Sequence, residues 1–192
     1  PIYLVSNRNS NNFKIYNSCS LVGNSAKLLQ STKWSELIDR SDVVIRMNAA
    51  LVANFEKNVG LKTDFRFVND PAWLHLDEKL RNVKERGVVL TCCFKSGFFH
   101  GGIDGRGTFD FCINPNFTTH VRDTLFRSTS VTPSTGLVAT MFLLNVCKRL
   151  DLFGFDFGAK NSANHYYDDR KLRTKTHNFA REKYIIHEFH NR

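Results

Sequence analysis

The sequence predicts an α/β layered fold with a largely parallel sheet. Short apolar, β-branched or aromatic runs recur along the chain, and helix-forming stretches separate them. The hydrophobic fraction of 42% and the length of 192 residues are sufficient for one domain with a buried core. We therefore expect a single domain over residues 1–192, in which helices flank a mostly parallel sheet.

Six runs are the candidate strands, and five stretches are the candidate helices. The strand runs read SCSLVG, SDVVIRMN, TDFRFVN, GVVLTCCF, TFDFCIN and RLDLFGFDF. The helices are expected over Ser25–Arg40, His75–Arg86, Thr118–Phe126, Ser134–Arg149 and His177–Phe189. Within the fourth expected helix, Leu137–Cys147 is the apolar stretch that should be buried. The strand that follows this helix is expected over Asp151–Phe155.

Ligands of a parallel sheet bind beyond the carboxyl ends of its strands, so the residues after each run are the place to look for chemistry. They are Gly23-Asn24-Ser25, Arg46-Met47-Asn48, Asn69-Asp70 and Gly154-Phe155-Asp156. The first corner lies between CSLV and AKLL, and a strand that delivers a small polar corner to a helix start commonly holds a phosphate. The sequence has no dinucleotide-binding Gly-x-Gly-x-x-Gly, no P-loop and no Asp-x-Asp metal clamp. A sugar-nucleotide enzyme of this sequence would therefore need another group to neutralise the leaving phosphate.

The net charge of +9 favours an anionic partner. A solvated basic surface explains the charge as readily as a partner does. Lys and Arg form no dense arm, recognition helix or Cys/His finger, so we expect no nucleic acid, and a small acidic substrate explains the balance equally well. No apolar run approaches the roughly 18 residues of a membrane helix, and any anchor would lie upstream of this chain. The five glycines of Lys95–Thr108 predict a mobile loop or a lid.

Three further stretches could carry chemistry. In PSTGLVATMFLL, the hydroxyls of Ser134 and Thr135 and the neighbouring N–H groups form a small anion-binding corner at a helix start. His165 lies in HYYD, and His177 opens HNFARE, where a helix start favours the neutral imidazole that a general base needs. Taken singly, a Ser/Thr corner of this kind is more often the cap of an ordinary core helix, and a lone histidine is more often a surface residue. His187 and His190 are read as surface residues of this kind.

Four stretches in this order resemble the motifs of the eukaryotic-type sialyltransferases. CSLVGNSAKLL, continued through LIDRSDVVIRMNAALVANFEKNVGLKTDFRFV, is similar to their large motif, and PSTGLVATMFLLNVCKRLDLFGFDF to their small motif. HYYD resembles motif III, and His177 with Glu182 resembles the very small motif, His-x-x-x-x-Glu. The resemblance implies a Rossmann-like fold and the transfer of sialic acid from CMP-sialic acid to a hydroxyl of a glycoprotein or glycolipid glycan. It also implies inversion, and no metal or other cofactor.

The resemblance assigns a role to individual residues. His177 would be the base that deprotonates the acceptor hydroxyl, and His165 would hydrogen-bond the leaving phosphate. Glu182 would support its helix or orient a partner. Asn24 and Asn48 would contact the CMP phosphate and ribose, and Ser25, beside Asn24, would also bind the donor substrate. Ser134, Thr135 and Gly136 would receive the sialic acid carboxylate and its surroundings, and Gly154 with its neighbour Phe155 would flank the nucleotide.

The resemblance also indicates the cellular compartment in which the protein would fold and act. Cys19 and Cys147 fall where the family joins its large and small motifs by a disulfide, which would pin the first strand to the helix after Ser134. Such a bond implies an oxidising lumen, with the Golgi as the natural setting. The other cysteines, Cys92, Cys93 and Cys112, match no motif and are read as buried thiols, and the sequon Asn116-Phe117-Thr118 leaves open whether a glycan is attached.

Several alternatives remain open at this stage. A sialyltransferase-like protein could bind CMP and glycans with little turnover. A metal site built from Cys92, Cys93, Cys112 and His100 is disfavoured because no Cys-x-x-Cys pair occurs. For the acceptor, the HYYD form is closer to members that sialylate sialic acid or GalNAc than to those that act at the 3-position of galactose.

Overall fold

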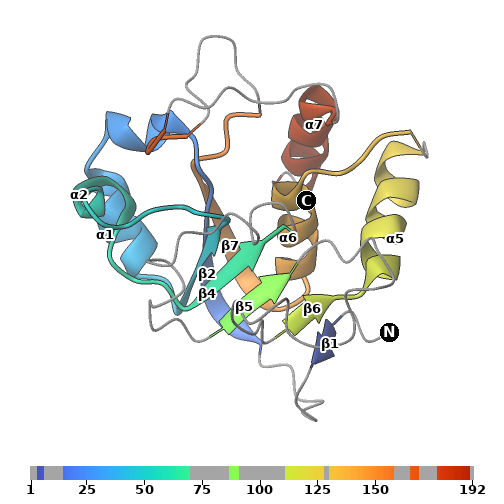
Figure 1. The fold of residues 1–192 in the computed structure, drawn as a ribbon, viewed down its shortest axis with the longest axis horizontal. Helices are drawn as coiled ribbons and strands as arrows, with labels where there is room; N and C mark the ends of the chain where they lie inside the picture. Colours follow the sequence, from blue (N-terminus) through green and yellow to red (C-terminus); the bar gives the residue numbers. More distant parts are fainter. Residues whose placement is uncertain are drawn as a thin grey trace, which may run out of the picture.

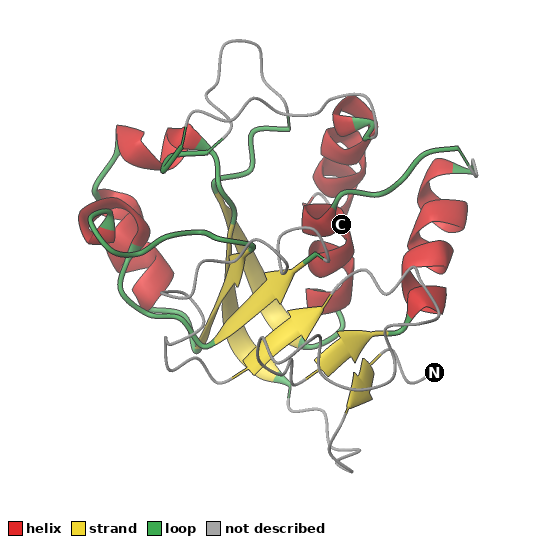
Figure 2. Ribbon diagram, in the orientation of Figure 1, coloured by secondary structure: helices red, strands yellow, loops and turns green. Residues whose placement is uncertain are grey.

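The computed structural model describes residues 4–6, 15–69, 87–90, 111–127, 130–157, 165–168 and 177–190. They form a sheet with helices on both faces (Figures 1 and 2), which confirms the predicted α/β class. The expected helix His75–Arg86 and the glycine-rich stretch Lys95–Thr108, together with Cys92 and Cys93, lie outside the described residues.

The sheet has seven strands in the order β1-β6-β5-β4-β3-β2-β7. All neighbouring strands are parallel except β1, which pairs antiparallel with β6. Each of the six predicted runs overlaps a strand, whereas β1 was not predicted because three residues are too short to show a pattern. The strands are β1 Leu4–Ser6, β2 Tyr16–Val22, β3 Val43–Met47, β4 Phe65–Val68, β5 Gly87–Leu90, β6 Phe111–Ile113 and β7 Cys147–Phe153.

The helices cover the two faces of the sheet separately. The first face is covered by the 3-10 helix η1 (Ala26–Gln30), α1 (Lys33–Asp39) and α2 (Glu56–Val59), and the second by α5 (Pro115–Phe126), α6 (Thr135–Leu143) and α7 (Phe179–His190) (Figure 1). Side chains of a strand alternate between the two faces. Val22 and Val44 therefore pack with Leu28 and Ile38 on the first face, while the second face holds the larger core, built from residues such as Leu21, Ile45, Phe67, Leu137 and Phe142.

The continuous helix predicted over Ser25–Arg40 is wrong. The segment divides into η1 and α1, because Ser31 between them is extended with φ −151°. Its hydroxyl accepts a hydrogen bond from the backbone N–H of Lys33 (3.1 Å), and the hydroxyl of Ser35 donates to the carbonyl of Thr32 (2.8 Å). Ser and Thr side chains that bond locally to the backbone compete with helix continuation, which explains the break.

The helix predicted over Ser134–Arg149 ends early, at Leu143, and the next strand begins at Cys147 rather than Asp151. The amide of Asn145 donates to the carbonyl of Met141 (2.8 Å), and β7 then pairs along the whole length of β2. Sheet pairing therefore outweighs the helix propensity of the residues after Leu143.

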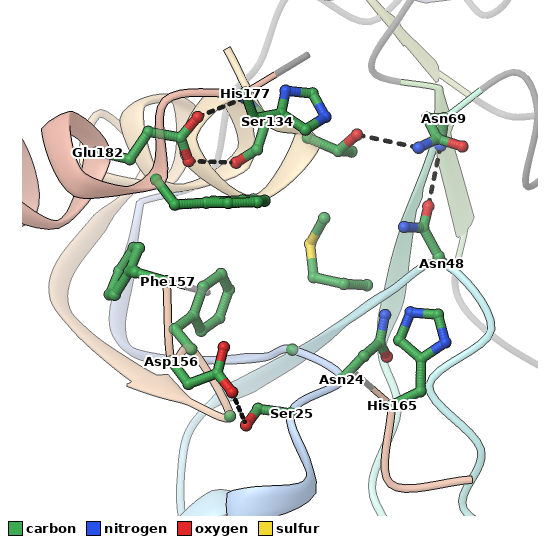
Figure 3. Close-up of a pocket in the computed structure, with 17 residues that line it drawn as sticks. Asn24, Ser25, Asn48, Asn69, Ser134, Asp156, Phe157, His165, His177 and Glu182 are labelled. Carbon is green, nitrogen blue, oxygen red and sulfur yellow. Dashed lines mark hydrogen bonds between the residues drawn. The ribbon is translucent and has the colours of Figure 1, made fainter. Parts of the chain in front are cut away.

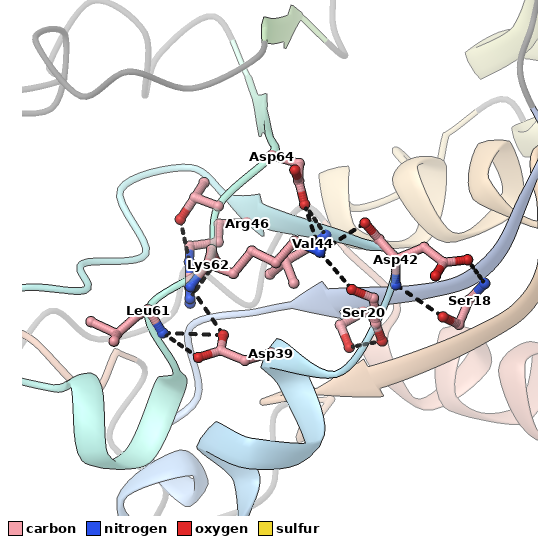
Figure 4. A network of polar contacts seen from close by, with 11 residues as sticks. Ser18, Ser20, Asp39, Asp42, Val44, Arg46, Leu61, Lys62 and Asp64 are labelled. Atoms are coloured by element: carbon pink, nitrogen blue, oxygen red, sulfur yellow. Dashed lines mark hydrogen bonds and ion pairs between the residues drawn. The ribbon is translucent and has the colours of Figure 1, made fainter.

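A polar network secures the end of the sheet where β3 and β4 begin (Figure 4). The carboxylate of Asp42 accepts from the N–H groups of Asn17 and Ser18 (both 3.1 Å), and that of Asp64 accepts from the N–H of Val44 (2.9 Å). The fully buried Arg46 donates to the hydroxyl of Thr63 and to the carbonyl oxygens of Val59, Gly60 and Lys62. Because most of these contacts tie the amino ends of strands to their connections, we assign the network a structural role.

No helix among the described residues is long and apolar enough to cross a lipid bilayer.

Candidate active site

A pocket of about 200 Å³ lies at the carboxyl ends of β2, β3, β4 and β7 (Figure 3). This is the edge of a parallel sheet at which ligands bind. The structure brings together all ten residues that the sequence indicated as catalytic or substrate-binding: Asn24, Ser25, Asn48, Ser134, Thr135, Gly136, Gly154, Phe155, His165 and His177. It adds Gly23, Met47, Asn69, Asp156, Phe157, Phe179 and Glu182.

The floor of the pocket is the junction of the corners that follow β2 and β7. The N–H of Gly23 donates to the carbonyl of Phe153 (2.7 Å), and the N–H of Ser25 donates to that of Gly154 (3.1 Å). A Cβ atom at Gly23 would lie 2.5 Å from the carbonyl oxygen of Gly154, so only glycine fits there. The hydroxyl of Ser25 donates to a carboxylate oxygen of Asp156 (2.9 Å), which ties the two corners together.

Asn48 has a left-handed backbone (φ 48°), a conformation that Asn tolerates better than most residues. Three contacts hold it there: its N–H donates to the carbonyl of Phe67 (2.7 Å), its carbonyl accepts from Arg66 (2.6 Å), and its side-chain oxygen accepts from the N–H of Asn69 (3.1 Å). The amide of Asn69 in turn donates to the hydroxyl oxygen of Thr135 (3.2 Å). A chain of hydrogen bonds thus connects β3, β4 and the start of α6 along one wall (Figure 3).

Glu182 joins α7 to the start of α6. Its carboxylate accepts from the backbone N–H of Ser134 (2.8 Å) and from the Ser134 hydroxyl (2.6 Å), while the same hydroxyl oxygen accepts from the N–H of Leu137 (3.1 Å). The side chain is buried, with the residue only 1% exposed. Burial raises the pKa of Glu182, and the two hydrogen bonds from Ser134 and the nearby His177 oppose that rise.

His177 lies two residues before α7 and contacts the loop that leads into α6. Its Nδ1 is 2.8 Å from the carbonyl oxygen of Thr132. A carbonyl only accepts, so we assign the ring proton to Nδ1. In the neutral imidazole, Nε2 then carries the lone pair.

His165 occupies a different part of the pocket, beside Asn24, whereas His177 lies beside Ser134 (Figure 3). The Nδ1 of His165 is 2.8 Å from a carboxylate oxygen of Asp168, and the ring stacks on Tyr167 with 5.0 Å between centroids. The two imidazoles therefore line one pocket from two separate walls.

Tyr166 anchors the short segment that carries His165. Its backbone N–H donates to the carbonyl of Asn24 (2.9 Å), and its hydroxyl donates to the carbonyl of Leu51 (2.5 Å). The side chain is buried against Val22, Leu28 and other core residues of the first face, and this burial raises the pKa of the hydroxyl, which keeps it a neutral donor. The segment 165–168 is thereby docked onto the corner after β2.

The predicted disulfide between Cys19 and Cys147 is present, with 6.0 Å between the Cα atoms. It connects β2 to the first residue of β7, so it fixes two neighbouring strands rather than a strand and the helix after Ser134. Within the part of the chain that the structure describes, no three His, Cys, Asp or Glu residues are grouped so that they could hold a metal ion.

Sequence reasoning missed some pocket residues. Asn69 and Asp156 follow strands and were indicated by position, although no role was given to them. Phe157, with a left-handed backbone (φ 51°), and Phe179 carried no signal, because an aromatic residue near an apolar run reads as core. The anchoring role of Tyr166 depends on two carbonyl groups that are distant in sequence, so no local pattern shows it.

Comparison with known proteins identifies the family to which the chain belongs. The family model of glycosyltransferase family 29 (sialyltransferase) matches residues 4–96 and 107–192, and the chain belongs to this family. Two solved structures share the fold. One is a mammalian sialyltransferase in complex with Gal-beta-1-3GalNAc-ortho-nitrophenol, with a TM-score of 0.70 and 25% identity over 92% of this chain and 66% of that one. The other is a mammalian sialyltransferase with a TM-score of 0.70 and 26% identity. Both are consistent with the Rossmann-like fold that the sequence predicted.

Curated relatives include a CMP-N-acetylneuraminate-beta-galactosamide-alpha-2,3-sialyltransferase 1 of Gallus gallus, 30% identical over 79% of this chain and 47% of that protein. The same enzyme of Homo sapiens is 28% identical over 79% of this chain and 48% of its own length. A beta-1,6-galactosyltransferase of Arabidopsis thaliana is 26% identical over 92% of this chain and 51% of that protein. The chain thus spans about half the length of the curated relatives it matches. Several relatives are named for an α-2,3 linkage, which the HYYD form did not favour.

Proposed function

We propose that this chain is the catalytic core of a sialyltransferase that moves sialic acid from CMP-sialic acid to a glycan hydroxyl, with inversion and without a metal, in the Golgi lumen. Membership of family 29 and the names of the relatives support the reaction class. The disulfide supports an oxidising compartment. The roles of individual residues follow from the hydrogen bonds of the pocket.

The hydrogen bond from His177 to Thr132 is the observation on which the mechanism depends. Because Nδ1 is engaged with a carbonyl, Nε2 of the neutral ring is the nitrogen available to accept a proton. A general base must present such a lone pair to the attacking hydroxyl. We therefore assign His177 as the base that deprotonates the acceptor hydroxyl as it attacks the anomeric carbon of sialic acid, while the bond to the CMP phosphate breaks.

His165 is assigned to the departing phosphate. Its Nδ1 faces the carboxylate of Asp168, which favours a proton on that nitrogen and orients the ring. When Nε2 also carries a proton, it can donate to the phosphate oxygen on which negative charge develops. This arrangement supplies a donor where many sugar-nucleotide enzymes use a metal ion.

Asn24 is assigned to the nucleotide. Its side-chain oxygen is buried and has no hydrogen-bond partner among the described residues, which is uncommon for a buried acceptor. A donor on the ligand, such as a ribose hydroxyl, would satisfy it. Asn48, held in its left-handed conformation across the pocket, is assigned to the same nucleotide with Ser25, Gly154 and Phe155.

The start of α6 is assigned to the carboxylate of sialic acid. Glu182 already takes the N–H and hydroxyl protons of Ser134, so Ser134 has neither donor left for a ligand. The first N–H groups of a helix have no partner within the helix, which leaves those of Thr135 and Gly136. The hydroxyl of Thr135, whose oxygen accepts from Asn69, retains its proton for donation. We therefore place the ligand carboxylate on Thr135 and Gly136, with Ser134 acting through the helix cap.

The test is transfer of labelled sialic acid from CMP-sialic acid to a mixed panel of glycan acceptors in the presence of EDTA, followed by linkage analysis. We expect transfer by the wild type, and its loss in His177→Ala with CMP affinity within a few-fold of wild type. His190→Ala, on the exposed end of α7, is the matched control and should retain transfer. Near-normal turnover of His177→Ala would remove His177 as the base, and inactivation by EDTA that Mn²⁺ reverses would overturn the metal-free mechanism.

The same panel separates two other candidates. The plant relative is named as a galactosyltransferase, so an activated galactose donor is included beside CMP-sialic acid. Transfer of galactose alone would assign a different donor to this pocket. CMP binding without any product would indicate the sialyltransferase-like binding protein instead.

A further inference from the structure

We propose that Asn116 carries an N-linked glycan. Asn116-Phe117-Thr118 is the only Asn-x-Ser/Thr triplet in the 192 residues, and this triplet is the acceptor for N-glycosylation in the secretory pathway. The inference rests on the secretory location given under the proposed function. Asn116 does not line the pocket to which the proposed reaction is assigned.

The side chain of Asn116 is available. Asn116 is the second residue of α5 and is exposed. Its backbone N–H is bound by the side chain of Asn114, which caps the helix (2.9 Å), but no hydrogen bond joins its own side-chain amide to another described residue. The amide nitrogen to which a glycan would be attached therefore has no structural role that would compete with modification.

The periodicity of α5 directs this side chain to solvent. Phe117 and Val121 are 5% and 4% exposed and pack in the larger core, whereas His120 and Asp123 are exposed. Asn116 lies one helical turn before His120 and two turns before Asp123, and therefore on the same face of the helix. A glycan at this position would stand on the solvent side of the helix and would not disturb the core.

The burial of Thr118, the third residue of the sequon, indicates when the glycan would be attached. Thr118 is only 2% exposed in the folded protein, so the modifying enzyme could not read its hydroxyl there. The glycan must therefore be added while this part of the chain is still unfolded, before α5 packs on the sheet. The same burial gives Thr118 a structural role in the core, so its identity is not explained by glycosylation alone, and the test must include a variant at this position.

The glycan would not obstruct the pocket. Asn116 is not among the residues that line the pocket, and β5 separates β6, the strand that precedes α5, from β4, the nearest strand whose end forms the pocket. The disulfide Cys19–Cys147 is independent support for the compartment, because such bonds form where N-glycans are attached.

The experiment uses the full chain secreted from cultured eukaryotic cells, as wild type, Asn116→Gln and Thr118→Ser. Each protein is treated with peptide-N-glycosidase and analysed by gel mobility and by mass spectrometry of the peptide around residue 116. Thr118→Ser keeps the sequon and is the matched control for a change within the triplet. The oxidation state of Cys19 and Cys147 is measured in the same samples.

We expect wild type and Thr118→Ser to gain mobility on treatment and to show Asp at position 116 in the treated peptide. Asn116→Gln should have the treated mobility from the start. A secreted, disulfide-bonded wild type whose mobility does not change would overturn the inference. Because the readout is mass and not transfer, that result would leave the proposed reaction untouched, and a glycosylated protein without transfer would count against the reaction alone.

Discussion

The carboxylate of Glu182 receives both the backbone N–H and the hydroxyl of Ser134 at the first turn of α6. Two residues upstream of Ser134, the carbonyl of Thr132 receives the Nδ1 proton of His177. His177, two residues before α7, and Glu182, in the first turn of α7, therefore hold the segment that leads into α6 at two points. The proposed base and the proposed carboxylate site are positioned by one set of contacts.

Glu182→Ala should destabilise the protein. The substitution removes the acceptor for a part-buried N–H and hydroxyl, for which we expect a loss of about 1–3 kcal/mol in the free energy of unfolding. Urea denaturation measures this loss. Glu188→Ala, exposed on the same helix, should stay within about 0.5 kcal/mol of wild type. Equal effects of the two substitutions would contradict the capping role of Glu182.

Glu182 should also impose a pH dependence on stability. Burial raises the pKa of Glu182 above that of an unfolded Glu, about 4.3, so the folded protein holds this proton to a higher pH than the unfolded chain does. Its contribution to stability is then fully present below the unfolded pKa and is lost as pH rises through the folded pKa. The difference in unfolding free energy between wild type and Glu182→Gln should therefore be largest near pH 4 and shrink towards neutrality. Denaturation curves across this range test the sign, and a gap that widens with pH would refute it.

Tyr166→Phe should loosen the segment that carries His165. The loss of the hydrogen bond to the carbonyl of Leu51 should cost about 0.5–1.5 kcal/mol of stability. Because the backbone bond to Asn24 remains, the protein should still fold and bind CMP, while kcat falls more than KM for the donor rises. Steady-state kinetics separate the two effects. Tyr184→Phe, 55% exposed on α7, is the matched control and should change neither.

Replacement of both Cys19 and Cys147 by Ala should lower the free energy of unfolding by about 2–5 kcal/mol. The bond joins β2 to β7, and the corners that follow these strands form the floor of the pocket. We therefore expect weaker CMP binding in addition to lower stability, measured by calorimetry and by denaturation. Unchanged stability of the double variant, with the wild type shown to be oxidised, would contradict a structural role for the bond.

The position of the site could be predicted because it follows from a rule of sheet geometry. The residues after the apolar runs include Asn24, Asn48, Asn69 and Gly154, and all four line the pocket. In a parallel sheet the carboxyl ends of neighbouring strands meet at one edge, so strand positions alone bring these residues together. The motif resemblance then added the residues that no strand end indicates, among them His165 and His177.

The sequence could not show what holds those residues in place. The early end of α6 depends on the pairing of β7 with β2, which local propensity does not contain. Likewise, Glu182 was expected only to support a helix or a partner, because its partner Ser134 lies 48 residues away in the chain. Long-range contacts of this kind are fixed by packing and not by pattern.

The place of β2 in the sheet has a consequence for synthesis on the ribosome. β2 is among the first strands to be made, yet its neighbour β7 and the partner of Cys19 follow 128 residues later. At about 5–20 residues per second, that thiol waits on the order of 10 s while Cys92, Cys93 and Cys112 are translated before its partner. Non-native disulfide bonds can form in that interval, so nascent chains should depend on thiol–disulfide exchange to reach the native Cys19–Cys147 bond.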